Sequence, residues 1–117
     1  MTHTVLLVED EEELREMMRE VLERAGYAVV AASEGQSALD AIAHVEKICV
    51  VLLDLLMPGM NGWDFFEAFR ALPQGASVPV VVHSSTPSRA PNGVTRVLQK
   101  PLKLDRLLSV VAEFCGP

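Results

Sequence analysis

The sequence lacks a long apolar run, an excess of basic residues and a leader segment. No stretch approaches the roughly 20 consecutive apolar residues of a membrane span, so we expect no membrane association. Ten Lys and Arg residues against 16 Asp and Glu give a net charge of −6, which repels phosphates and argues against direct nucleic-acid binding. The N-terminus has no basic segment leading into an apolar run, and the only two cysteines, Cys49 and Cys115, suit a reducing compartment. These absences together predict a cytoplasmic protein.

The remaining composition is that of an ordinary globular domain. The chain has 117 residues, of which 50% are hydrophobic and 22% are charged. A chain of this size can bury a core of its own, and its composition excludes a disordered tail. Because no linker follows the last predicted element, we expect a single domain over residues 1–117.

Short apolar runs and helical segments alternate along the chain. The runs predict strands at residues 5–8, 27–32, 49–53, 78–82 and 95–99. The third and fourth runs are continuous and rich in Val, which is typical of strands covered on both faces. Apolar residues at helical spacing predict helices along residues 14–25, 34–46 behind a Ser33–Gln36 capping box, 61–73 with Asn61 as the cap, and 104–114.

This alternation predicts a three-layer α/β sandwich around a parallel sheet. Five strands favour the flavodoxin-like order 2-1-3-4-5, in which the first and third strands are neighbours and ligands bind outside their carboxyl ends. Between Ser84 and Thr95, however, two prolines and an Asn-Gly pair oppose a helix. We therefore expect the fourth helix of this fold to be missing or reduced to a single turn.

Polar residues gather at the predicted carboxyl ends of the strands. Glu9 and Asp10 end the first strand and Asp54 ends the third, so three carboxylates are expected to converge. Oxygen ligands without His or Cys suit Mg²⁺, and the repulsion among carboxylates favours a bound cation or a basic neighbour. Ser84 and Lys100 follow the fourth and fifth strands. This set of groups is suited to handling a phosphoryl group.

Four motifs in this order resemble the receiver domains of two-component response regulators, and the resemblance covers essentially the whole chain. The motifs are VLLVEDE at 5–11, VVLLDLLMPGMNG at 50–62, VPVVVHSS at 78–85 and LQKP at 98–101. The resemblance implies that Asp54 accepts a phosphoryl group from a partner histidine kinase or phosphotransfer protein. Such a domain is not an enzyme in the usual sense, since at most it catalyses its own phosphorylation and dephosphorylation.

The same resemblance assigns the other site residues. Glu9, Asp10, Asp54 and the backbone carbonyl of Leu56 would hold Mg²⁺. Lys100 would pair with the phosphoryl oxygens, and its bond to Pro101 is expected to be cis. Ser84 matches the hydroxyl residue that moves toward the phosphoryl group on activation. The phosphorylated state would then be recognised by a downstream protein partner.

The sequence departs from the family pattern at three further places. Val97 replaces the usual Tyr or Phe, and it is too short and too restricted in rotamer for that ring's movement. Leu56 and Thr86 occupy positions that influence how water reaches the acyl phosphate in similar domains. With the reduced fourth helix, Val97 also favours an alternative, a phosphorylation-independent pseudo-receiver that binds a partner constitutively. A phosphatase with an aspartyl nucleophile ranks last, because the chain has no cap for a small substrate.

Two nearby features have plainer interpretations. Glu11, Glu12 and Glu13 are expected to be solvated residues of a first helical turn, where acidic side chains are favourable. His83 lies one residue before Ser84, so strand alternation predicts that it points away from the phosphorylation site as a hydrogen-bonded, partly buried histidine.

Overall fold

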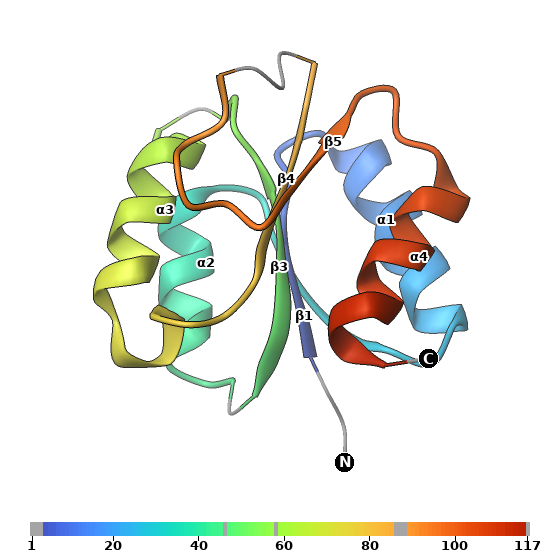
Figure 1. Cartoon of the computed structure of the whole chain (residues 1–117), viewed down its shortest axis with the longest axis horizontal. Helices are drawn as coiled ribbons and strands as arrows, with labels where there is room; N and C mark the ends of the chain where they lie inside the picture. Colours follow the sequence, from blue (N-terminus) through green and yellow to red (C-terminus); the bar gives the residue numbers. More distant parts are fainter. Residues whose placement is uncertain (1–3, 46, 58, 86–88, 117) are drawn as a thin grey trace.

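The computed structural model describes residues 4–45, 47–57, 59–85 and 89–116, and its core is one parallel sheet (Figure 1). The sheet order is β2-β1-β3-β4-β5, which confirms the predicted flavodoxin-like topology. The strands are β1 (Thr4–Val8), β2 (Ala28–Ala32), β3 (Ile48–Asp54), β4 (Val80–Ser84) and β5 (Arg96–Gln99). The first-to-third neighbour relation therefore places the ends of β1 and β3 side by side.

Helices cover both faces of the sheet, as expected for a three-layer sandwich. In Figure 1, α2 and α3 lie on one side of the sheet and α1 and α4 lie on the other. Their bounds are α1 (Glu12–Arg24), α2 (Gly35–Ile42), α3 (Gly62–Ala71) and α4 (Leu104–Cys115), with a 3₁₀ turn η1 at Pro73–Gly75. Successive strand residues enter opposite cores: Leu6 and Val8 pack on the α2 and α3 side, whereas Val5 and Leu7 pack on the α1 and α4 side.

The connection from β4 to β5 contains no α-helix within its described residues, 85 and 89–95, as the prolines predict. The chain instead lies against the α3 side of the sheet, where Val94 and Val97 pack on the buried core. The indole Nε1–H of Trp63, at the start of α3, donates a hydrogen bond to the Arg89 carbonyl at 2.9 Å. The label α4 thus belongs to the helix that follows β5.

Two local predictions need correction. The helix expected over 34–46 spans only Gly35–Ile42, and its N-cap is Glu34 with no side-chain cap, so the Ser33–Gln36 capping box is wrong. The strand expected at 78–82 lies two residues further along, at Val80–Ser84, because Pro79 precedes the ladder and the polar His83 and Ser84 pair within it. The Asn61 cap is confirmed, since its Oδ1 accepts the Asp64 N–H at 3.0 Å.

A disulfide joins Cys49 near the start of β3 to Cys115 in the last turn of α4. This bond corrects the expectation that both cysteines are reduced, since nothing in a separation of 66 residues indicates a pairing. The bond fastens the C-terminal helix to the sheet at the end opposite Asp54. A second contact there is the hydrogen bond from the Tyr27 hydroxyl to the Gly116 carbonyl at 2.6 Å.

No helix within the described residues is long and apolar enough to cross a membrane.

We predict that reduction of the Cys49–Cys115 disulfide lowers the thermal stability of the protein. Closing a loop of this length restricts the unfolded chain and contributes up to about 4 kcal/mol. Thermal unfolding with and without reductant should show a clear fall in Tm for the wild type. The Cys49→Ser/Cys115→Ser variant serves as the matched control and should unfold at the same temperature in both conditions. A wild-type Tm that does not respond to reductant would contradict the prediction.

Candidate functional site

Strand register brings the predicted site residues to one edge of the sheet. Val8 pairs with Leu53, so the next residues of the two chain segments, Glu9 and Asp54, lie side by side at the ends of β1 and β3. Asp54 in turn pairs with His83 of β4. The Lys100 N–H donates to the Ser84 carbonyl at 2.9 Å, which extends the β4–β5 pairing to the base of the Lys100 side chain. The carboxyl ends of β1, β3, β4 and β5 therefore lie along one edge of the sheet, which includes the point between β1 and β3 where the strand order reverses.

Two carboxylates are buried at this edge and share one lysine. Glu9 is fully buried and Asp54 is 4% exposed. The Lys100 Nζ lies 3.4 Å from Glu9 Oε1 and 3.5 Å from Asp54 Oδ1. A buried carboxylate needs such partners because its charged form loses water on burial. One ammonium between two carboxylates leaves a negative charge uncompensated when both acids are ionised.

Glu9 is held by three donor groups. Besides Lys100, its Oε1 contacts the His83 Nε2 at 2.8 Å, and its Oε2 accepts the Glu11 N–H at 3.0 Å. Burial alone would raise the pKa of Glu9, but the His83 and Glu11 hydrogen bonds and the nearby cationic charge outweigh it and lower the pKa to about 2. Glu9 is therefore the carboxylate that stays ionised.

Asp54 has the opposite balance. Burial and the negative charge of Glu9 raise the pKa of Asp54 to about 7, despite the opposing effects of Lys100 and of the Leu56 N–H. The Leu56 N–H donates to Asp54 Oδ1 at 3.3 Å. Asp54 is thus the group whose ionised form lacks compensation, and a cation beside it would favour that form.

The other predicted site residues lie around this pair. Asp10 is exposed and interacts with Asp54 through its side chain, which contributes to the raised pKa of Asp54. Leu56 is the most exposed of the large apolar side chains described, at 59%. Ser84 is buried at the end of β4. Gly62 fixes the loop after Asp54, since a Cβ there would lie 2.6 Å from the Leu55 Cα.

His83 was predicted to point away from this site, and that prediction is wrong. Alternation does place His83 and Ser84 on opposite faces of β4. However, His83 is the register partner of Asp54, so it shares the face of Asp54 and Glu9. Ligand atoms of Glu9, Asp54 and His83 lie within 4.8 Å of one another. The sequence-based prediction took the face of Ser84 as the face of the site, whereas the strand register places Asp54 on the face of His83.

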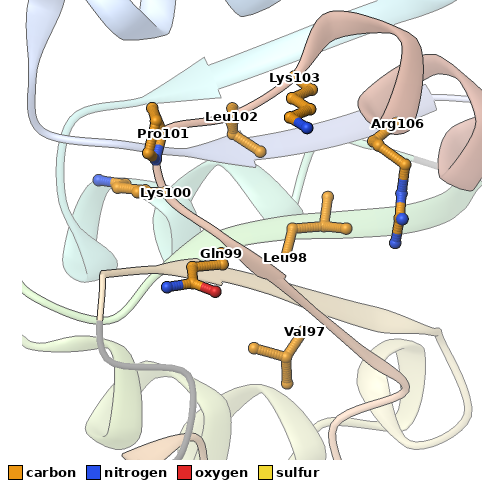
Figure 2. A pocket seen from close by; sticks show the side chains of 8 residues that line it. All are labelled: Val97, Leu98, Gln99, Lys100, Pro101, Leu102, Lys103 and Arg106. Carbon is orange, nitrogen blue, oxygen red and sulfur yellow. The ribbon is translucent and has the colours of Figure 1, made fainter.

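A groove of about 480 Å³ runs beside the lysine (Figure 2). It is lined by β5 and the following segment, and the Lys100–Pro101 peptide bond in its wall is cis, as the resemblance implied. Three basic side chains, Lys100, Lys103 and Arg106, border it. This side of the site is therefore locally basic although the chain as a whole is acidic.

The donor chemistry at the strand ends fits a hard divalent cation. Glu9 and Asp54 are buried oxygen donors, Asp10 is exposed at the mouth, and a single lysine opposes them. Mg²⁺ takes one or two carboxylates and keeps several waters, which an open acidic mouth allows. His83 does not alter this fit, because its Nε2 is engaged with Glu9.

The fold and the site define an α/β protein with two buried carboxylates at its topological switch point. The sequence model of the response regulator receiver domain matches residues 5–112. The chain therefore belongs to the response regulator receiver domain family. Among curated relatives it is 29% identical over 110 residues to the transcriptional regulatory protein HprR of Escherichia coli, which covers 92% of this chain and 49% of HprR. The chain thus spans about half the length of HprR.

Solved structures show the same fold. Chemotaxis protein CheY4 of Vibrio cholerae is 28% identical, with a TM-score of 0.87 over 97% of this chain and 99% of that one. The receiver domain of sensor histidine kinase PA1611 of Pseudomonas aeruginosa, whose structure has a magnesium ion coordinated in the active site cleft, has a TM-score of 0.87 and covers both chains fully. At 23% identity this second likeness shows the fold alone.

We predict that Asp54→Asn stabilises the metal-free protein at pH 8. The pKa of Asp54 is higher in the folded state, about 7, than in the unfolded chain, about 3.8, so ionisation costs stability as pH rises through this window. The variant should gain about 1 to 3 kcal/mol at pH 8, and the gain should shrink as the pH approaches 4.

Thermal melts of both proteins in EDTA across this pH range measure the difference. Asp64→Asn, which removes an exposed carboxylate from the first turn of α3, is the matched control and should not stabilise the protein at pH 8, because a negative charge is favourable at that position. A constant difference between the wild type and Asp54→Asn would refute the assignment.

Proposed function

We propose that this chain is a phosphoacceptor of two-component signalling, acting as a single receiver domain over residues 1–117 in the cytoplasm. Asp54 takes its phosphoryl group from a phosphohistidine of a partner histidine kinase or phosphotransfer protein. The observation that carries the proposal is the position of Asp54. It is a buried carboxylate at the switch point, with Lys100 at 3.5 Å and Glu9 beside it.

The transfer itself is a displacement at phosphorus. An oxygen of the Asp54 carboxylate forms the new P–O bond, the P–N bond to the donor histidine breaks, and its electron pair stays on the imidazole nitrogen, which takes up a proton. The product is an acyl phosphate on Asp54. Asp54 must attack in its ionised form, and cationic groups beside it favour that form.

The surrounding residues divide two tasks. Glu9, Asp10, Asp54 and the Leu56 carbonyl are the groups that would hold Mg²⁺, because carboxylate and carbonyl oxygens are the ligands that this cation prefers. When bound, Mg²⁺ neutralises charge on the transferring oxygens. Lys100 supplies a second positive charge to those oxygens. Ser84, at the end of β4, offers a hydroxyl donor to the phosphoryl group. A partner protein would recognise the phosphorylated state on this side of the domain.

The output of such a domain is a protein contact rather than catalytic turnover or nucleic-acid binding, for which a net charge of −6 is unsuited. The region that carries the output differs from the family pattern. Residues 85 and 89–95 have no α-helix, and Val97 packs against the α3-side core in place of an aromatic ring. We propose that a downstream protein recognises a surface that includes residues 89–95, the described part of the segment leading into β5.

We predict that a small phosphodonor labels Asp54 in a Mg²⁺-dependent reaction. Acetyl phosphate should add one phosphoryl group per chain with Mg²⁺ and at least about tenfold more slowly in EDTA. Intact-mass measurement of the wild type, Asp54→Asn and Asp64→Asn decides the site, because only Asp54→Asn should lose the label. A folded wild type that stays unlabelled with Mg²⁺ would favour the constitutive pseudo-receiver.

We also predict that Leu56 slows hydrolysis of the acyl phosphate. Its exposed apolar side chain follows Asp54 by two residues and can exclude water from the phosphoryl group. Leu56→Asn should raise the dephosphorylation rate severalfold, measured by loss of label after the donor is removed. Leu104→Asn, at another exposed leucine, should leave the rate unchanged. An equal rate in Leu56→Asn and wild type would overturn the prediction. Thr86, the other position linked to water access, lies outside the described residues.

A further inference from the structure

His83 is a fully enclosed polar residue in a strand of valines. It is 1% exposed, and the three preceding residues of β4 are buried valines. A histidine at such a position costs free energy unless its polar atoms are hydrogen-bonded. Its Nε2 lies 2.8 Å from Glu9 Oε1, so this ring is tied to the acidic site rather than to the apolar core alone.

The state of the ring follows from its two nitrogens. Nδ1 has no hydrogen-bond partner among the described residues. A proton on Nε2 makes the hydrogen bond to Glu9 Oε1, whereas a proton on Nδ1 alone would set two acceptors against each other and leave a buried N–H without a partner. His83 therefore donates to Glu9 through Nε2.

Glu9 Oε1 receives two donors, and the second is the lysine needed at Asp54. The Lys100 Nζ lies almost equally far from Glu9 Oε1 and Asp54 Oδ1, at 3.4 and 3.5 Å. If the His83 N–H were removed, Lys100 would be the remaining one of these two side-chain donors to the buried Glu9 Oε1. A buried carboxylate that loses a hydrogen bond would then draw the ammonium toward itself and away from Asp54.

We propose that His83 is a positioning residue for phosphoryl transfer: by donating to Glu9 Oε1, it keeps Lys100 shared with Asp54 and available to the incoming phosphoryl group. This inference rests on the proposed function and deepens it. It assigns a role to a residue whose side-chain hydrogen bond goes to Glu9 and not to Asp54. Its action passes entirely through Glu9 and Lys100.

A double-mutant cycle tests this route. His83→Leu should slow labelling by acetyl phosphate at saturating Mg²⁺ about tenfold, the size expected for one hydrogen-bonded coupling. In a Lys100→Met background the same substitution should change the rate by less than about twofold, since the lysine it positions is gone. An equal fold-loss in both backgrounds would show a merely structural role and overturn the proposal.

Conservative variants separate the donor from the packing. His83→Gln places an amide N–H near the position of Nε2 and should restore the rate to within about twofold of wild type. His83→Asn is too short to reach Glu9 and should not. This pair decides the question even where His83→Leu does not fold. His44→Leu, at an exposed histidine beyond α2, is the matched control and should leave the rate unchanged.

A second readout needs no phosphoryl transfer. The ¹³C resonance of the Asp54 carboxyl senses the Lys100 ammonium in the unphosphorylated protein. Lys100→Met should change the chemical shift of that carboxyl in an otherwise wild-type chain. In a His83→Leu background it should change the shift very little, because Lys100 already pairs with Glu9 there. Equal shifts in both backgrounds would refute the positioning role. A chain that takes up no phosphate would therefore contradict the proposed function, whereas the NMR measurement would still test the positioning role of His83.

Discussion

One lysine shared by two buried carboxylates is the constraint on which the site depends. Lys100 lies within 3.5 Å of both Glu9 and Asp54, and neither acid has access to much water. One ammonium cannot compensate both charges, so the two acids diverge: hydrogen bonds lower the pKa of Glu9 while burial raises that of Asp54. The acid that lacks compensation is Asp54, the proposed phosphoacceptor.

The fold brings these side chains together from distant parts of the sequence. Parallel strands end on the same edge, and the order β2-β1-β3-β4-β5 makes the ends of β1 and β3 neighbours. The apolar residues on both faces of β3 hold Asp54 at the end of a rigid strand. The disulfide lies at the other end, so it stabilises the helix layer without entering the site.

Much of this arrangement could be predicted from the sequence. Alternating apolar runs gave the strand order, and acidic residues after two of them indicated the crevice. The prolines and the Asn-Gly pair predicted the absence of an α-helix from the described residues between β4 and β5. The rest depended on register and tertiary contact. His83 was expected to point away because Ser84 was taken to mark the site's face of the sheet, whereas the register places Asp54 on the face of His83. The 66-residue separation gave no sign that Cys49 pairs with Cys115. The predicted capping box of α2 failed because the helix begins one residue later than the box requires, at Gly35 with Glu34 as its N-cap.

The most direct test of the shared-lysine arrangement is the titration of the Asp54 carboxyl by ¹³C NMR, with Asp54→Asn assigning the resonance. Without divalent cations the pKa should lie near 7, well above the usual value of 3.8 for an aspartate. Saturating Mg²⁺ should lower this pKa, because a bound cation favours the carboxylate. An Asp54 that titrates near its ordinary value, with no response to Mg²⁺, would contradict the account.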